Sequence, residues 1–175
     1  IAYAQYHYAI MDHMKNDEDV SKWYAFGKTP QQLEKDICTR AQSKKNCAGE
    51  DVSKQDGMQN LILRIFQRMI IKQAFDEKNA KECLQLHAQM RHLKVYTSFG
   101  FKYYLTTEQG SGFMDTSDFN SLNMALQRFI TFRKLGQSKQ QAWTSLLTCY
   151  EGGGDDSLTF HNYTPIKFKK ACDEA

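Results

Sequence analysis

Cys83 and His87 lie four positions apart, a spacing that puts two side chains on the same face of a helix. An imidazole beside a thiol can activate it as a nucleophile, so Cys83 with His87, or with His92, is a candidate for a cysteine-dependent hydrolase. However, such enzymes usually bring their cysteine and histidine together from separate elements. We therefore favour the alternative, a buried thiol beside a half-exposed imidazole, and predict no catalytic residue.

Two groups of side chains are candidates for binding a metal ion. Cys83 and His87 could supply two ligands to a structural zinc ion, which takes four. The sequence has no CxxC or HxxxH spacing to supply the others. His7 and His13 lie close in sequence to Met11 and Met14, a mixture of ligands that soft copper accepts. A core stripe with a hydrogen-bonded histidine is far commoner, so we predict no metal ion and no cofactor.

Basic residues form three groups that could contact phosphate. The groups are Arg64, Arg68 and Lys72; Arg133, Lys134 and Lys139; and Lys167, Lys169 and Lys170. The formal charge of the chain is only +3, and no helix-turn-helix, zinc-finger or RNA-recognition signature occurs. We interpret the basic groups as solvated faces or salt-bridge partners, and predict no nucleic-acid partner. The nucleotide-binding and hydrolase motifs GxxxxGK[ST], GxGxxG, HExxH and GxSxG are also absent.

The chain contains five cysteines, an odd number. In an exported protein this suggests two disulfides and one free thiol. Cys38, near the end of a predicted helix, could pair with Cys47 in the polar segment 43–56, and Cys149 with Cys172. Cys83 would then be free or would pair between chains. Because the printed sequence also begins with an isoleucine rather than a methionine, we expect a protein that is secreted or periplasmic.

Aromatic residues are concentrated between positions 96 and 113. They are Tyr96, Phe99, Phe101, Tyr103, Tyr104 and Phe113. Exposed aromatic side chains are typical of the residues that dominate protein interfaces, so these six are candidate binding residues. The alternative is that they belong to the core.

The helix expected to organise the fold runs from position 57 to 78. Its apolar residues recur at i, i+3, i+4 and i+7, and further apolar residues widen this stripe over most of the circumference. Such a helix is usually buried by several neighbours, and its charges exclude a membrane span. We therefore predict a mainly α fold, an irregular multi-helix bundle around a central buried helix at 57–78, in a single domain over residues 1–175.

Smaller elements are predicted from local signals. Residues 95–105 and 158–163 alternate in polarity, so we predict that they pair as one small two-stranded β element. The segments 29–32 and 138–141 have the capping-box pattern, which predicts helices that begin there.

Three functions are compatible with these observations. The first is an exported, non-enzymatic helical protein that binds another protein, such as an inhibitor, an immunity-type partner of a toxin or a host-directed secreted factor. The second is a disulfide-stapled helical carrier of an apolar small molecule, since the chain has 11 Phe, 9 Tyr and 7 Met. The third is a hydrolase that uses Cys83. We favour the first.

Overall fold

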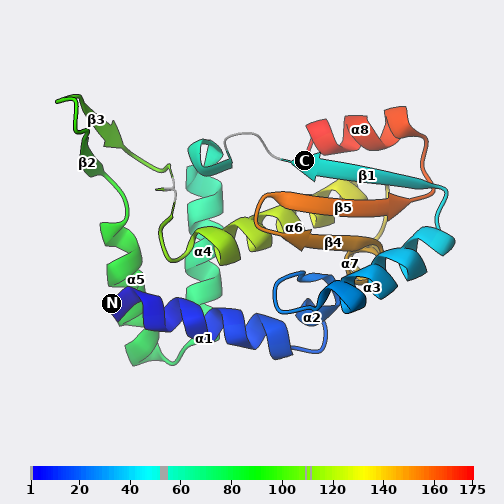
Figure 1. Cartoon of the computed structure of the whole chain (residues 1–175), viewed down its shortest axis with the longest axis horizontal. Helices are drawn as coiled ribbons and strands as arrows, with labels where there is room; N and C mark the ends of the chain where they lie inside the picture. Colours follow the sequence, from blue (N-terminus) through cyan, green and yellow to red (C-terminus); the bar gives the residue numbers. More distant parts are fainter. Residues whose placement is uncertain (1, 52–54, 109, 111) are drawn as a thin grey trace. The chain divides into compact units, whose positions relative to one another are not determined.

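The computed structural model describes residues 2–51, 55–108, 110 and 112–175 (Figure 1). This part of the chain is mainly helical, as predicted, with eight α-helices, one 3-10 helix and five strands. The helices are α1 (Ala2–Asn16), α2 (Val20–Trp23), α3 (Pro30–Gln42), η1 (Gln55–Met58), α4 (Leu61–Ala74), α5 (Glu77–Gln89), α6 (Thr116–Lys134), α7 (Lys139–Cys149) and α8 (Pro165–Asp173). The strands are β1 (Asn46–Asp51), β2 (Leu93–Tyr96), β3 (Lys102–Leu105), β4 (Tyr150–Gly153) and β5 (Asp156–His161). Among the described helices, none combines the length and the hydropathy that crossing a bilayer requires.

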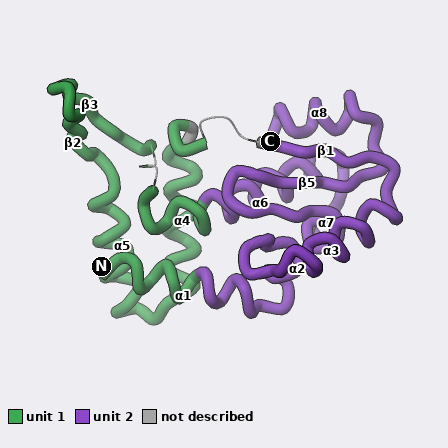
Figure 2. The backbone as a smooth tube through the Cα atoms, in the orientation of Figure 1, with its two compact units in different colours: residues 1–10, 53–119 green, residues 11–52, 120–175 purple. Residues whose placement is uncertain are grey.

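The chain divides into two compact units, coloured separately in Figure 2. Unit 1 comprises residues 1–10 and 53–119, and unit 2 comprises residues 11–52 and 120–175. Helices α1 and α6 contribute residues to both units. The single domain expected over residues 1–175 stays a prediction, because this division does not say whether either unit folds alone.

Unit 2 contains a three-stranded antiparallel sheet in the order β1-β5-β4. Helices α6, α7 and α8 share a hydrophobic core with this sheet, and Ala48 of β1 packs against it. The buried members of this core are Phe132, Leu135, Ala142, Cys149, Phe168 and Ala171. On β4, the buried carboxylate of Glu151 accepts hydrogen bonds from Lys28 (2.7 Å) and Arg40 (2.5 Å), which ties α3 to the sheet.

Unit 1 packs α4 against α5, and the β2–β3 hairpin follows α5 in the chain (Figure 1). Its interior contains buried side chains from α1, α4, α5 and the first turn of α6. These include Tyr3, Tyr6, Ile71, Cys83 and Phe119.

Both predicted capping boxes are present. The side chain of Thr29 accepts a hydrogen bond from the backbone of Gln32, whose side chain bonds back to the Thr29 N–H, and Pro30 begins α3. Ser138 and Gln141 do the same at the start of α7. These local signals identified the starts of two helices because all their partners lie within one turn.

The central buried helix expected at 57–78 is not confirmed. The segment is divided into η1, which ends at Met58, the helix α4 and the start of α5. On α4, Leu61, Ile62, Ile65 and Met69 are exposed, each by 50 to 74% of its surface, whereas Arg64 and Gln67 are fully buried. The pattern predicted a helix correctly, but α4 turns its aliphatic stripe outward.

The predicted β pairing is also corrected. Residues 95–105 do not pair with 158–163; β2 pairs with β3 in an antiparallel hairpin, with Leu93 opposite Leu105. Leu158 lies in β5, which pairs with β1 and β4. The segment 43–56 is not only loop, because it contains β1 and the start of η1; residues 52–54 of it lie outside the described part. Pairing partners follow from tertiary packing, which period-two alternation does not encode.

Candidate functional site

The β2–β3 hairpin exposes five of the six predicted binding residues. Between 48 and 87% of each side chain is exposed, with Phe99 the most exposed. The five are Tyr96, Phe99, Phe101, Tyr103 and Tyr104. The alternative that these five side chains belong to the core of unit 1 is therefore wrong.

The loop of the hairpin is closed by its own backbone. The Thr97 N–H donates to the Phe101 carbonyl (2.9 Å), and the Gly100 N–H donates to the Thr97 carbonyl (3.0 Å). Gly100 has a φ of 83°, a conformation that glycine adopts without strain. The Thr97 hydroxyl accepts from the Phe101 N–H (3.1 Å). These bonds present Phe99 and Phe101 at the tip of an ordered turn.

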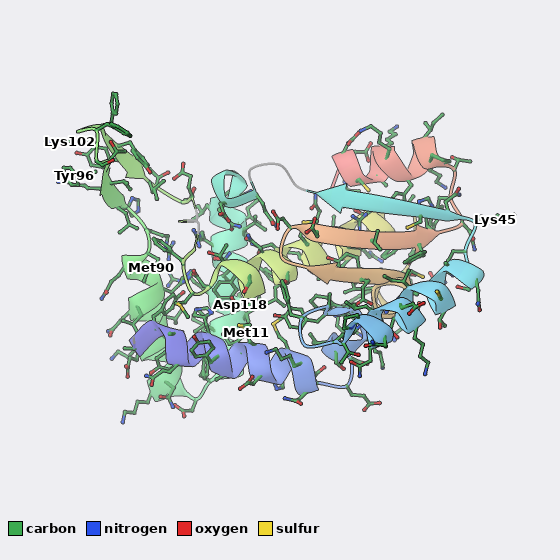
Figure 3. All side chains as sticks on the ribbon, in the orientation of Figure 1. Met11, Lys45, Met90, Tyr96, Lys102 and Asp118 are labelled. Atoms are coloured by element: carbon green, nitrogen blue, oxygen red, sulfur yellow. The ribbon has the colours of Figure 1, made fainter. Side chains whose placement is uncertain are left out.

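One face of the hairpin alternates lysine with tyrosine. Lys102 Nζ lies 5.5 Å from the centre of the Tyr96 ring, and Lys94 Nζ lies 6.0 Å from that of Tyr104. Each pair is directly cross-strand. Figure 3 shows Tyr96 and Lys102 on this hairpin. Aromatic rings and cations together can contact both apolar and acidic groups.

Phe113, the sixth predicted residue, is separate from this surface. It follows the hairpin and is only half-buried, with its ring over the Cα of Gly110. A side chain at position 110 would clash with the ring, so this contact needs glycine.

A buried polar network occupies the interior of unit 1. The Tyr3 hydroxyl donates to Asp115 Oδ2 (2.9 Å) and also lies 2.9 Å from His87 Nδ1. Since the hydroxyl has a single proton, His87 Nδ1–H is the donor in the second bond. His7 Nδ1 donates to Asp118 Oδ2 (2.6 Å), as expected for a histidine that belongs to the core. The network joins α1, α5 and the start of α6.

Cys83 lies in this interior with its side chain fully buried. Burial, and to a smaller extent the negative charge of Asp115, raises the pKa of its thiol to about 12. Burial lowers the pKa of the His87 imidazole, against the opposing effect of Asp115. A nucleophilic cysteine needs a lowered pKa and access to substrate, so this arrangement is not that of an activated thiol.

No group of three or more metal-ligating side chains occurs within the described residues. Asp115 and Asp118, which contact the buried His87 and His7 of unit 1, were missed by the sequence reasoning. Their only sequence signal was a position at the start of a helix, which is equally typical of a cap.

All five cysteines are free in the structure, so neither predicted disulfide is present in it. Cys38 and Cys47 are exposed on α3 and on β1, where the sheet fixes Cys47 opposite Phe160. Cys149 is buried in the core of unit 2. Short sequence separation alone does not bring two sulfur atoms into bonding geometry.

Cys172 has polar neighbours of its own. Its Sγ lies 3.2 Å from Arg128 Nη1 and 3.5 Å from Glu50 Oε1, beside a surface hollow of about 540 Å³ in unit 2. Arg128 and Glu50 also form an ion pair. Burial raises the pKa of the Cys172 thiol, and this outweighs the lowering by Arg128. Cys172 is therefore held as a neutral thiol that donates to Glu50.

Two of the three basic groups are solvated, as predicted. Arg133, Lys134 and Lys139 are exposed, and on α8 Lys169 and Lys170 pair with acidic residues four positions later. The third group differs, because Arg64 is buried while Arg68 and Lys72 are exposed.

No known protein-family profile matches this chain, and no curated protein does.

Proposed function

We propose that this chain is an exported, non-enzymatic protein that binds another protein through the β2–β3 hairpin. The observation that carries the proposal is the exposure of five aromatic side chains on one hairpin. Tyrosine and phenylalanine are enriched at protein interfaces, where a few buried aromatic residues supply most of the binding energy. Large exposed apolar surfaces are uncommon on monomeric proteins and are typical of interaction sites.

The secondary structure of this site also favours a partner. A two-stranded hairpin is marginally stable alone, and no other described strand pairs with the outer edge of β2 or of β3. A partner that covers the aromatic side chains, or adds an extended segment to one edge, would stabilise the hairpin.

Photo-crosslinking in an extract from the source organism tests the proposal. The full chain is prepared with benzoylphenylalanine in place of Phe99, and in a control in place of Ile166, which is 85% exposed on α8. We expect the probe at position 99 to crosslink one protein that the probe at position 166 does not. Identical products from both positions would contradict the proposal.

A double variant then tests the identified partner. Phe99→Ser with Phe101→Ser should weaken binding at least about tenfold, because the two rings would no longer be buried in the interface. Tyr8→Ser with Ile166→Ser removes exposed apolar side chains of similar exposure elsewhere and should leave binding unchanged. Neither pair should alter the free energy of unfolding by more than about 0.5 kcal/mol.

Carriage of an apolar small molecule is a second candidate function. Unit 2 has a surface hollow of about 520 Å³, a volume typical of ligand sites, with Phe26, Leu33, Ile37 and Leu158 in its lining. Saturable binding of a fluorescent apolar probe at one site per chain would support it. Leu33→Asp should then weaken probe binding, whereas Ile166→Asp should not.

A further inference from the structure

Helix α4 presents an apolar stripe to solvent because its polar side is held inside unit 1. The guanidinium of Arg64 donates to the carbonyls of Thr107 (2.9 Å) and Glu108 (3.0 Å) and to the side chain of Gln67 (3.0 Å). Gln67 in turn donates to Gln59 Oε1 (3.1 Å). A rotation of α4 that buried its aliphatic residues would break all of these bonds and bring Arg64 out of its site. The outward stripe is therefore a fixed feature of the unit.

Three cations border this stripe and line one hollow with it. The hollow measures about 160 Å³, and its lining is Leu61, Ile65, Arg68, Met69, Lys72 and Arg91. Within the described part of the chain, none of the three cations forms an ion pair with a carboxylate. Partial burial lowers the pKa of Arg91, and the positive charge of Arg68 lowers it further. Two guanidinium groups thus lie close together beside an apolar hollow.

Helix α4 contributes no acidic residue to offset these charges, since its sequence is LILRIFQRMIIKQA. A complementary ligand has an apolar side that covers the stripe, a side chain that enters the hollow and carboxylates that reach the cations. From Leu61 to Lys72 the helix is about 17 Å long, which is three turns. An amphipathic helix laid along another helix has this length, this apolar stripe and flanking charges.

We propose that the outward face of α4, formed by Leu61, Ile62, Ile65 and Met69 and bordered by Arg68, Lys72 and Arg91, binds an acidic amphipathic helix of a partner protein. This surface shares no residue with the β2–β3 hairpin. It therefore adds a second site for protein binding, and this inference does not depend on the hairpin proposal. A helix is favoured over an anionic lipid surface because the hollow accepts a projecting side chain, whereas a lipid surface has none to insert.

The test measures binding of a synthetic peptide to the full chain by fluorescence anisotropy. The peptide is a fluorescein-labelled helix of about 18 residues with leucine at every third or fourth position and glutamate elsewhere. A second peptide replaces every glutamate with lysine. We expect saturable binding of the acidic peptide, at least about tenfold tighter than that of the basic one, and weaker binding as NaCl is added.

Matched variants locate the site. Ile62→Ser with Ile65→Ser, and separately Arg68→Glu with Arg91→Glu, should each raise the dissociation constant at least about tenfold. Ile166→Ser and Lys81→Glu are the apolar and the charge control, because both residues are exposed on other helices, and should change nothing. Phe99→Ser with Phe101→Ser should also leave peptide binding unchanged, so failure of this inference is distinguishable from failure of the hairpin proposal.

Three results would overturn the inference. One is equal binding of the acidic and basic peptides, and another is equal loss of binding in the control variants. The third is binding to phosphatidylglycerol vesicles that depends on Ile62 and Ile65 in the absence of peptide binding, which would identify α4 as a lipid-binding helix instead. Circular dichroism of each variant, compared with that of the wild type, checks that the helix content of the chain is unchanged.

Discussion

Arg64 determines the rotation of α4 through hydrogen bonds from one guanidinium. Two of its acceptors are backbone carbonyls of the segment that follows β3, at Thr107 and Glu108. A buried charge is stable only where donors and acceptors are matched, and these carbonyls have their partner in Arg64. One buried arginine thus directs four aliphatic side chains into solvent.

Replacing Arg64 with methionine should destabilise the fold. The substitution keeps an apolar stem but leaves the carbonyls of Thr107 and Glu108 without this donor, which costs about 2–3 kcal/mol. Urea unfolding followed by circular dichroism measures the change. Arg68→Met, on the exposed side of the same helix, should cost less than about 0.5 kcal/mol, and equal losses in the two variants would refute the assignment.

Cys83 should be inert in the folded protein. Its thiol is fully buried and its pKa is raised to about 12, so at pH 8 it is protonated and inaccessible. Iodoacetamide under native conditions should label Cys38 and Cys47, which are exposed, and leave Cys83 unmodified until the chain is unfolded. Peptide mass spectrometry measures each site. Native labelling of Cys83 as fast as Cys38 would restore the hydrolase hypothesis.

At the scale of elements, α1, α5 and the first turn of α6 are joined by polar side chains rather than by apolar contact alone. His87 bonds to Tyr3 on α1, which bonds to Asp115 beside α6. The Nε2 atom of His87 is buried with no hydrogen-bond partner among the described residues. Protonation of Nε2 would place a buried N–H there without an acceptor. The lowering of the His87 pKa by burial is therefore larger than the raising by Asp115.

This network predicts a dependence of stability on pH. The unfolded imidazole takes up a proton near pH 6.5, above the lowered folded pKa of His87, so the unfolding free energy decreases as pH falls from 7. The loss approaches about 1.4 kcal/mol per pH unit for one proton. In His87→Gln, the slope between pH 7 and 5 should be smaller, as measured by urea unfolding. An unchanged slope would show that His87 does not contribute.

Two further groups affect the dependence of the unfolding free energy on pH. Burial raises the pKa of Asp118 above its ordinary value, so its contribution is present at low pH and is lost as pH rises through the folded pKa. On acidification, Asp118 therefore increases the unfolding free energy while His87 decreases it. The contribution of His87 is obtained from the difference in slope between wild type and His87→Gln. Burial also lowers the pKa of His161 in unit 2, so His161→Gln should flatten the profile independently.

At the scale of the whole molecule, stability comes from two compact units without covalent cross-links between described residues. The mass of the unreduced protein should therefore equal that of a chain with five thiols. A reducing agent should leave both this mass and the thermal unfolding midpoint unchanged. Each disulfide would lower the mass by two hydrogens, and such a deficit in protein from the natural source would restore the predicted pairing of Cys38 with Cys47.

The parts of the fold that the sequence predicted are those with local causes. The starts of α3 and α7 were predicted because a cap and its partner lie three residues apart. The alternation from position 95 to 105 predicted strand, which is correct for β2 and β3 but not for residues 97–101, where the chain reverses at Gly100. The candidate binding surface was found for the same reason, since its five exposed residues lie within nine positions of one hairpin.

The parts that the sequence did not predict depend on distant residues. Arg64 and its carbonyl partners are 43 and 44 positions apart, and β1 meets β5 across more than a hundred residues. A hydrophobic period shows which residues share a face, but buried hydrogen bonds decide which face turns inward.

By itself, the sequence determined a mainly helical chain with two capped helix starts and an aromatic stretch of strand type. Only the tertiary structure decided that α4 faces outward, that the strands form two sheets and that the five cysteines stay apart. The physical reason is that capping and alternation act within a few residues, whereas burial of Arg64 and the positions of sulfur atoms depend on how the whole chain packs.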